Sequence, residues 1–248
     1  MSKNFELMQQ TGRGPVMTSS PSQIPQKPLS VSHANGNGHR NGNGVGLNLD
    51  DLAQEETLKL VQRVFLLQAG EVPRTVIFAG IDHGNGCSRV CARTAQVLAA
   101  NTPGRVCIVD ANLRSPSPKP LLEEPDPEYD NTRKGHRRIA ENLWLATCDS
   151  LTANGGASTL DQMRVMIKDL RHEFEHVVIN APPVGLYSDA ALLGQSADGL
   201  VLVLEANSTR RVAARKAKLA LEASNVLVLG TVLNNRTFPI PEKIYRLL

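Results

Sequence analysis

The sequence predicts an α/β fold of three layers, α/β/α, in which helices cover both faces of a mostly parallel sheet. Short β-branched runs alternate along the chain with segments of helical spacing, as this fold class requires. Two runs, 199–204 (GLVLVL) and 226–233 (VLVLGTVL), are uniformly apolar, which is typical of parallel strands buried on both faces. Aromatic residues make up only 4% of the 248 residues, so Val, Leu, Ile and Ala must fill the core.

The individual elements follow from the same patterns. Strands are expected at 75–79, 106–109, 143–146, 177–179, 199–204 and 226–233, and helices at 52–68, 88–100, 158–174 and 209–222. Ser158 is a candidate N-cap for the third helix, and Ser208 or Thr209 for the fourth. The stretch 115–138 is acidic and rich in proline before it becomes basic, which predicts a mobile loop.

The first 51 residues differ in composition from the rest. They are poor in apolar residues and include the run HANGNGHRNGNGVG at 33–46. Such a segment cannot bury enough surface to offset the entropy lost on ordering. We therefore expect a disordered Asn/Gly-rich tail at 1–51, which serves as a tether, and one folded domain at 52–248.

Composition also limits the compartment and the partners. The four cysteines form no CxxC pair, the first residues lack a signal-peptide core, and no apolar run approaches the roughly 18 residues that span a bilayer. These features predict a reduced, cytoplasmic chain without a transmembrane segment. Because the net charge is only +3, nucleic acid is not expected as a partner, although Arg210, Arg211, Arg215, Lys216 and Lys218 form a basic patch on one predicted helix.

A glycine-rich turn joins the strand at 75–79 to the helix at 88–100. Strand, glycine turn and helix form the layout of a phosphate-binding loop, in which backbone N–H groups and the helix dipole attract anions. The signature G-x-x-x-x-G-K-[ST] adds a lysine for the β- and γ-phosphates. Gly84, Gly86 and Ser88 match this signature, but Cys87 occupies the lysine position. The sequence thus predicts a P-loop NTPase-like fold with a degenerate loop.

Four polar segments are expected to meet at one edge of the sheet. They are 80–88, 110–114, 180–183 and 234–235, and each follows a predicted strand. Ligands of open α/β sheets bind where the carboxyl ends of the strands emerge. This edge is therefore the predicted binding site.

The same segments, in the same order, resemble the cytoplasmic ATPase domain of the bacterial tyrosine kinases of polysaccharide-export systems, within the MinD/ParA-like class of P-loop proteins. The resemblance rests on HGNGCSR (83–89), IVDANLRSP (108–116), VINAPPVGLYSDA (178–190), ADGLVLVL (197–204) and GTVLNN (230–235). It also includes the closing segment PIPEKIYRLL (239–248) and covers about residues 55–248.

The resemblance implies the residues of a nucleotide site. The implied contacts for a nucleotide are Gly84, Asn85, Gly86, Cys87, Ser88, Arg89 and, for adenine, Asn234. The implied counterparts of the family's Walker A′ and B segments are Asp110, Asn112, Arg114, Asn180 and Pro182.

Three of the family's four charged groups are neutral here. The family's lysine is replaced by Cys87, and two of its aspartates are replaced by Asn112 and Asn180. Asp110 alone keeps its charge. A charge-assisted hydrogen bond contributes about 1.5–3 kcal/mol, so ATP or ADP binding should be weak. Because Mg²⁺ prefers carboxylates, a Mg²⁺ site is not expected. Arg89 does not replace the lysine, since two residues along a helix is a rotation of about 200°. No residue is assigned as catalytic, with Asp110 the candidate if the protein is active.

Two further departures concern assembly and phosphorylation. The family's ring-forming E-x-x-R-x-x-R pattern appears as Glu56, Lys59 and Gln62, which argues against a ring but leaves a homo-oligomer open. The family's cluster of tyrosines near the carboxyl terminus is reduced to Tyr245, which helical spacing favours as a packing residue.

Cys87 admits two other interpretations. A cysteine at a helix N-terminus has a lowered pKa, which would suit a redox role. His83, Cys87 and Cys91 are also spaced four residues apart, but His83 precedes the helix and no fourth ligand is evident, so no metal site is expected.

The resemblance implies a cytoplasmic partner of an inner-membrane polysaccharide co-polymerase or chain-length determinant. The leading interpretation is a protein that regulates exopolysaccharide polymerisation and export by binding rather than by catalysis, with the first helix and the basic patch facing that partner. Two alternatives remain: an active tyrosine autokinase or ATPase of the same pathway, and a ParA/MinD-like partitioning protein.

Overall fold

The computed structural model of the chain describes residues 49–66, 71–114, 132–133, 136–147 and 159–236. The helical elements are α1 (Leu49–Val61), the short π-helix η1 (Gln62–Leu66), α2 (Cys87–Asn101), α3 (Thr159–Glu173), α4 (Asp189–Gly194) and α5 (Arg211–Ala223). The strands are β1 (Thr75–Gly80), β2 (Val106–Asp110), β3 (Thr132–Arg133), β4 (His136–Ala140), β5 (Leu143–Thr147), β6 (His176–Ala181), β7 (Gly199–Glu205) and β8 (Val228–Asn234).

The described strands form one eight-stranded sheet in the order β3-β4-β5-β2-β6-β1-β7-β8. Every pair from β5 to β8 is parallel, whereas β3, β4 and β5 pair antiparallel. The predicted class, a mostly parallel sheet within an α/β protein, is confirmed. The strand β1 lies at the centre, between β6 and β7, so the loop that follows it emerges in the middle of the carboxyl edge.

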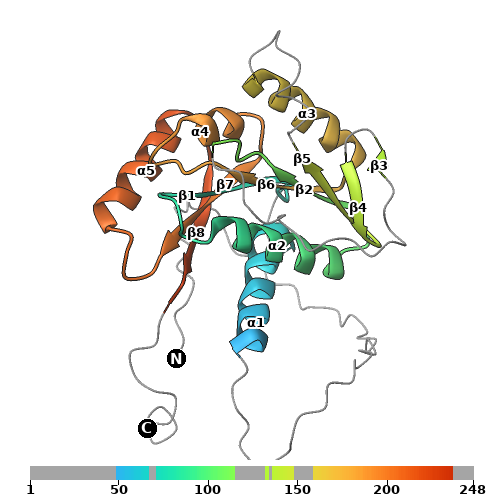
Figure 1. Cartoon of the computed structure of the whole chain (residues 1–248), viewed down its shortest axis with the longest axis horizontal. Helices are drawn as coiled ribbons and strands as arrows, with labels where there is room; N and C mark the ends of the chain where they lie inside the picture. Colours follow the sequence, from blue (N-terminus) through green and yellow to red (C-terminus); the bar gives the residue numbers. More distant parts are fainter. Residues whose placement is uncertain (1–48, 67–70, 115–131, 134–135, 148–158, 237–248) are drawn as a thin grey trace, which may run out of the picture.

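Helices lie on both faces of the sheet (Figure 1). Helices α1 and α2 cover one face, where Phe65, Phe78, Leu98 and Val178 belong to a single apolar core. Helices α3, α4 and α5 cover the other face over a second core, in which Met163 is buried. The alternation of side chains along each strand separates the two cores, because successive residues of a strand point to opposite faces.

The prediction of a loop at 115–138 is wrong for its last residues, because His136 begins strand β4. Residues 115–131 and 134–135 lie outside the described part of the chain. Strand β4 pairs antiparallel with β5, and its His136 is buried against Phe174 with ring centroids 5.3 Å apart. Arg138 stacks over the Trp144 ring at 5.5 Å. Long charged side chains cover apolar surface along their stems, so a basic run can form a strand at the side of a sheet.

Two expectations near the carboxyl end are also corrected. The segment 226–233 was predicted as a fully buried strand, but β8 is an edge strand and Leu233 is 50% exposed. The predicted cap of α5 is absent: Arg210 occupies the N-cap position, with no side-chain cap bond. The Thr209 hydroxyl instead accepts a hydrogen bond from the Glu205 N–H at 2.9 Å. Helix α4 was not predicted, because six residues are too few to show helical periodicity.

The first helix begins at Leu49 rather than residue 52 and ends in the π-helical turn at Leu66. Leu60, Val61, Val64 and Phe65 of this segment are buried, so its carboxyl half covers the sheet as expected. The tail expected at 1–51 falls almost wholly outside the described residues, as do the predicted cap Ser158 and the closing segment with Tyr245. Within the described part of the chain, no helix combines the length and apolar character needed to cross a membrane.

Candidate nucleotide-binding site

The glycine loop connects β1 to α2 and makes a sharp turn that only glycine adopts readily. Gly84 and Gly86 have φ angles of 80° and 76°, in the left-handed region. A Cβ atom on Gly86 would lie 2.3 Å from the Nδ2 of Asn234. Asn234 also donates a hydrogen bond from its Nδ2 to the Asn85 carbonyl oxygen at 2.9 Å. The last strand therefore contacts the loop, as the predicted meeting of segments at this edge requires.

Asn85 turns its side chain into the protein and bonds the loop to itself. The side chain is buried, and its Oδ1 accepts a hydrogen bond from the Cys87 N–H at 3.0 Å. Its Nδ2 donates to the Val203 carbonyl oxygen at 3.4 Å. A Cβ atom on Gly80 would lie 1.7 Å from the same Nδ2, so only glycine fits beneath it. A backbone N–H that a phosphate-binding loop would offer to an anion is thus already bonded within the loop.

Cys87 lies in the apolar core rather than at the mouth of the loop. It belongs to the core between the sheet and α1 and α2, together with Cys91. Burial raises the pKa of Cys87 to about 12, which outweighs the lowering by a backbone hydrogen bond to Gly80. The lowered pKa expected from the helix N-terminus is therefore wrong, since removal from water is the larger effect. His83 is exposed and contacts Tyr187, with ring centroids 6.0 Å apart, so the structure does not group it with the two cysteines.

Asn180 connects two other polar residues, Asp110 and Ser88, at the centre of the edge. Its Nδ2 donates to Asp110 Oδ1 at 3.0 Å and to Ser88 Oγ at 3.2 Å. Asp110 and Asn180 are register partners on the adjacent strands β2 and β6, which fixes their separation. A carboxylate only accepts hydrogen bonds, so the NH₂ group of the amide must face Asp110.

This arrangement bears directly on Mg²⁺. In P-loop enzymes a Ser or Thr hydroxyl and an acidic residue hold the metal. Here the Asn180 amide lies between Ser88 Oγ and Asp110 Oδ1 and donates a hydrogen bond to each. The Asn180 Oδ1 is buried and has no hydrogen-bond partner among the described residues. In this arrangement the residues present do not fit a Mg²⁺ ion, because the Asn180 amide donates an N–H to each of the two oxygens that would be its ligands.

The segment after β2 is held by hydrogen bonds and by an ion pair with α4. The Asn112 N–H donates to Asp110 Oδ1 at 3.2 Å. Arg114 forms a bidentate pair with Asp189, with Nε–Oδ2 at 2.8 Å and Nη2–Oδ1 at 3.2 Å. The hydrogen bond to Asp189 raises the pKa of Arg114. The guanidinium also lies over the Tyr187 ring at 5.4 Å. Arg114 thus holds the start of α4, a partner that the sequence did not identify.

The remaining predicted residues lie as follows. Pro182 is buried, and Ser88 is half-buried. Arg89 is exposed on α2, as its helical position predicts. On α1, Lys59 pairs with Glu55 at 2.9 Å and with Glu56 at 3.0 Å, so these charges are used within the helix. Gln62 begins the π-helical turn.

At the opposite, amino edge of the sheet, a charged cluster joins three elements. Asp198 Oδ2 accepts hydrogen bonds from the N–H groups of Arg74 and Thr75, both at 2.8 Å. Its Oδ1 pairs with Arg171 Nη2 at 2.7 Å. Burial alone would raise the pKa of Asp198, but these hydrogen bonds and the Arg171 charge lower it below 3.8. The sequence showed Asp198 only as part of a motif before β7, because its partners are distant along the chain.

Comparison with known proteins gives a consistent result. No family model matches the chain. The chain is 39% identical over 69 residues to tyrosine-protein kinase CpsD of Streptococcus agalactiae, across 28% of this chain and 30% of the relative. It is 35% identical over 180 residues to tyrosine-protein kinase YwqD of Bacillus subtilis, across 66% of this chain and 73% of the relative. The fold is similar to the kinase domain of Escherichia coli tyrosine kinase ETK, with a TM-score of 0.52, 19% identity and coverage of 68% of this chain and 71% of that one.

The fold and the glycine loop at its carboxyl edge define a domain of the P-loop, ParA-like class. Within that class, the match to YwqD extends over most of both chains. The chain belongs to the bacterial tyrosine kinase family.

Proposed function

We propose that this protein is a member of the family that acts by binding rather than by phosphoryl transfer. The observation that carries the proposal is the hydrogen bonding of Asn180, whose amide joins Asp110 to Ser88 at 3.0 and 3.2 Å. Phosphoryl transfer depends almost wholly on positioning and on electrostatic stabilisation of the phosphates. A site whose metal position holds an amide, and whose lysine position holds a buried thiol, supplies neither metal nor lysine charge.

A weak nucleotide site remains part of the proposal. The glycine loop keeps its left-handed turns at Gly84 and Gly86, and the N-terminus of α2 still presents the positive end of its dipole. Binding must compete with the hydrogen bond between the Cys87 N–H and Asn85, and it lacks the lysine. Loss of one charge-assisted bond, about 1.5–3 kcal/mol, reduces affinity by roughly one to two decades. We expect ATP and ADP to bind weakly and without dependence on Mg²⁺.

Family membership supports a proposal for the partner. Like the family it resembles, the chain would act with an inner-membrane polysaccharide co-polymerase or chain-length determinant, as a cytoplasmic regulator of exopolysaccharide polymerisation and export. Co-purification with such a membrane protein from cells that express both supports this proposal. Consistent recovery of partitioning proteins or DNA, with no polysaccharide-assembly component, contradicts it.

An assay of phosphate transfer to tyrosine tests the loss of catalysis. The wild type is expected to transfer no more phosphate from ATP than the Asp110→Ala variant does. The variant is the matched control because, of the family's four charged groups, Asp110 is the one that remains. Transfer by the wild type that disappears in Asp110→Ala would contradict the proposal.

That contrary result would favour the alternative, an active tyrosine kinase. The observation on its side is that Asp110 lies at the carboxyl end of β2, within hydrogen-bonding distance of Asn180 and at the same edge as the loop. Asp110 would then be the catalytic residue, and another group would supply the missing positive charge.

A further inference from the structure

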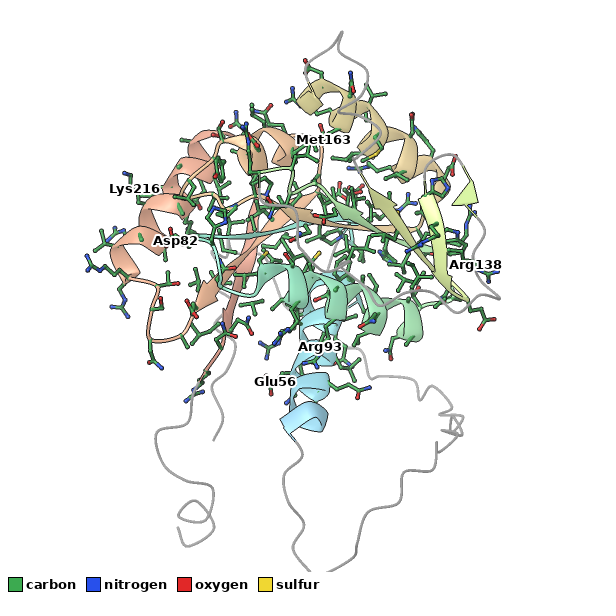
Figure 2. All side chains as sticks on the ribbon, viewed as in Figure 1. Glu56, Asp82, Arg93, Arg138, Met163 and Lys216 are labelled. Atoms are coloured by element: carbon green, nitrogen blue, oxygen red, sulfur yellow. The ribbon has the colours of Figure 1, made fainter. Side chains whose placement is uncertain are left out.

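Helix α5 is the outermost element on its side of the molecule, next to the edge strand β8 (Figure 1). Only Ala217 and Leu221 of this helix are buried. Figure 2 shows the side chain of Lys216 directed outward from the helix. Most of the helix surface is therefore open to contact with something other than the described part of the chain.

The open face of α5 carries several positive charges. Arg210, Arg211, Arg215 and Lys216 are exposed, and none of them forms an ion pair with another described residue. The one acidic residue of the helix, Glu222, pairs with Lys218 at 2.8 Å. The face therefore suits a negatively charged partner and disfavours a second copy of the same face.

Two aliphatic side chains lie on the same face as the charges. Val212 is 79% exposed and Leu219 is 56% exposed. Residues 212, 215, 216 and 219 are spaced i, i+3, i+4 and i+7, so they form one stripe along the helix. The stripe places Arg215 and Lys216 between the two aliphatic residues.

Helix α3 shows that an exposed aliphatic residue alone is not distinctive. Its Val165 is 59% exposed. The exposed charged residues around it, Asp161, Lys168 and Asp169, are of both signs. The combination of one sign of charge with two aliphatic side chains is what sets α5 apart from α3.

We propose that this face of α5 docks the protein on an anionic phospholipid surface. Cationic residues are attracted to acidic head groups, and apolar residues on the same helix face insert into the boundary with the acyl chains. Nucleic acid would use the cations but gains little from Val212 and Leu219, because its backbone contacts are electrostatic. The inference goes beyond the proposed function, since it needs neither a nucleotide nor a protein partner.

The test is co-sedimentation of the full-length chain with vesicles of phosphatidylcholine, with and without phosphatidylglycerol. We expect binding only to vesicles that contain phosphatidylglycerol, and weaker binding at higher salt. Each cation near such a surface contributes about a fivefold factor, so the charge reversal Arg215→Glu should weaken binding at least about tenfold. Leu219→Ser should weaken it about fivefold.

Two variants on α3 are matched controls. Lys168→Glu makes the same change of charge, and Val165→Ser makes a comparable loss of exposed apolar surface. Both are expected to bind vesicles as the wild type does. Since all four positions are exposed, each variant should keep the urea midpoint of the wild type, which verifies that the domain is folded.

Three results would overturn the proposal. The first is absence of binding to phosphatidylglycerol vesicles at low salt. The second is wild-type binding by both Arg215→Glu and Leu219→Ser, which would assign any binding to another part of the chain. The third is binding of a DNA duplex that Arg215→Glu abolishes and Leu219→Ser leaves intact, without binding to vesicles.

Discussion

The two ends of the central strands use polar residues in opposite ways. At the amino edge, the charged Asp198 binds the backbone of Arg74 and Thr75 and pairs with Arg171. At the carboxyl edge, the neutral Asn180 joins Asp110 to Ser88. Both clusters hold neighbouring elements together, but Asp198 does so through an ion pair with Arg171, whereas Asn180 does so through the hydrogen bonds of a neutral amide.

The amino-edge cluster serves the stability of the fold, whereas the carboxyl edge is where the family's phosphoryl transfer would take place. The charges at the amino edge connect β1, β7 and α3, so they contribute to the fold whether or not a ligand binds. At the carboxyl edge, the family's chemistry would need a lysine and a metal, and the groups present are a buried thiol and an amide. The molecule therefore has an ion pair where Asp198 links elements at the amino edge. At the carboxyl edge it lacks the lysine that phosphoryl transfer would use, although Asp110 and the Arg114–Asp189 pair keep their charges there. Five predictions test the contrast.

The largest expected effect is on the reactivity of Cys87. With its pKa raised to about 12 from an ordinary value of 9.0, the thiolate fraction falls by about a thousandfold. Alkylation of Cys87 at mildly alkaline pH should therefore be about a thousandfold slower in the native protein than in urea, as measured by mass spectrometry. Equal rates in the two conditions would show that the loop is open and that Cys87 is available to a ligand.

The amino edge should depend strongly on Asp198. Asp198→Ala leaves two backbone N–H groups and Arg171 without their partner, and hydrogen bonds to charged groups contribute about 1.5–3 kcal/mol. Because the cluster is partly exposed, we expect a loss of about 3 kcal/mol in the free energy of unfolding by urea. The control Asp169→Ala, at an exposed position on α3, should change it by less than about 0.5 kcal/mol. Equal losses of unfolding free energy in the two variants would contradict the claim that the Asp198 cluster stabilises the fold.

The same carboxylate gives a pH dependence. The folded-state pKa of Asp198 lies below the ordinary value of 3.8, so its contribution to stability is complete above pH 3.8. The contribution is lost as the pH falls through the lower, folded-state pKa. Unfolding midpoints measured along an acid titration should therefore decline less steeply in Asp198→Asn than in the wild type. Parallel declines would contradict the assignment.

At the carboxyl edge, Asn180→Asp should destabilise the protein in the absence of metal. The substitution places a second carboxylate about 3 Å from Asp110, and like charges at this distance repel. We expect a loss of about 2 kcal/mol that Mg²⁺ reverses, because the ion can then bridge the two groups. Asn101→Asp at the end of α2 should show no recovery with Mg²⁺. Destabilisation that Mg²⁺ fails to reverse would mean that the edge cannot accept a cation.

The smallest effect concerns His176, which is buried at the amino edge beside Phe65. Burial lowers its pKa below 6.5, so the unfolded chain binds a proton more readily than the native protein does. Stability should decline slightly as the pH falls below 6.5, and His176→Phe should remove that decline. Substitution of the exposed His172 by Gln should leave it in place. An unchanged decline in His176→Phe would assign it to other groups.

The sequence predicted the centre of the fold better than its sides. The central strands β1, β2, β6 and β7 are buried on both faces. Their uniform apolar runs therefore allow them to be predicted from the sequence. Strand β4 looked like a loop because its basic residues gain their packing only from tertiary contacts, Arg138 on Trp144 of the next strand and His136 on Phe174 after α3. Strand β8 carries the same apolar pattern as β7, but nothing in that pattern shows that its outer side is an edge.

For the candidate site, the sequence predicted which segments meet at the carboxyl edge but not the hydrogen bonds between them. It brought Asn180, Asp110 and Ser88 to one edge, because the ends of parallel strands lie together. It could not show that the Asn180 amide bonds to both neighbours, since this depends on the register of β2 and β6. The pKa of Cys87 was predicted in the wrong direction, because burial is a property of the tertiary packing and outweighs the local helix terminus.

A calorimetric titration of ATP and ADP, with and without Mg²⁺, tests the central claim most directly. It compares the wild type with the double variant Cys87→Lys/Asn180→Asp, which restores the charges of the family. The wild type should bind weakly or not at all and without response to Mg²⁺, whereas the double variant should bind with a clear dependence on Mg²⁺. Tight, Mg²⁺-dependent binding by the wild type would contradict the account, because it would show that other residues supply the missing charge.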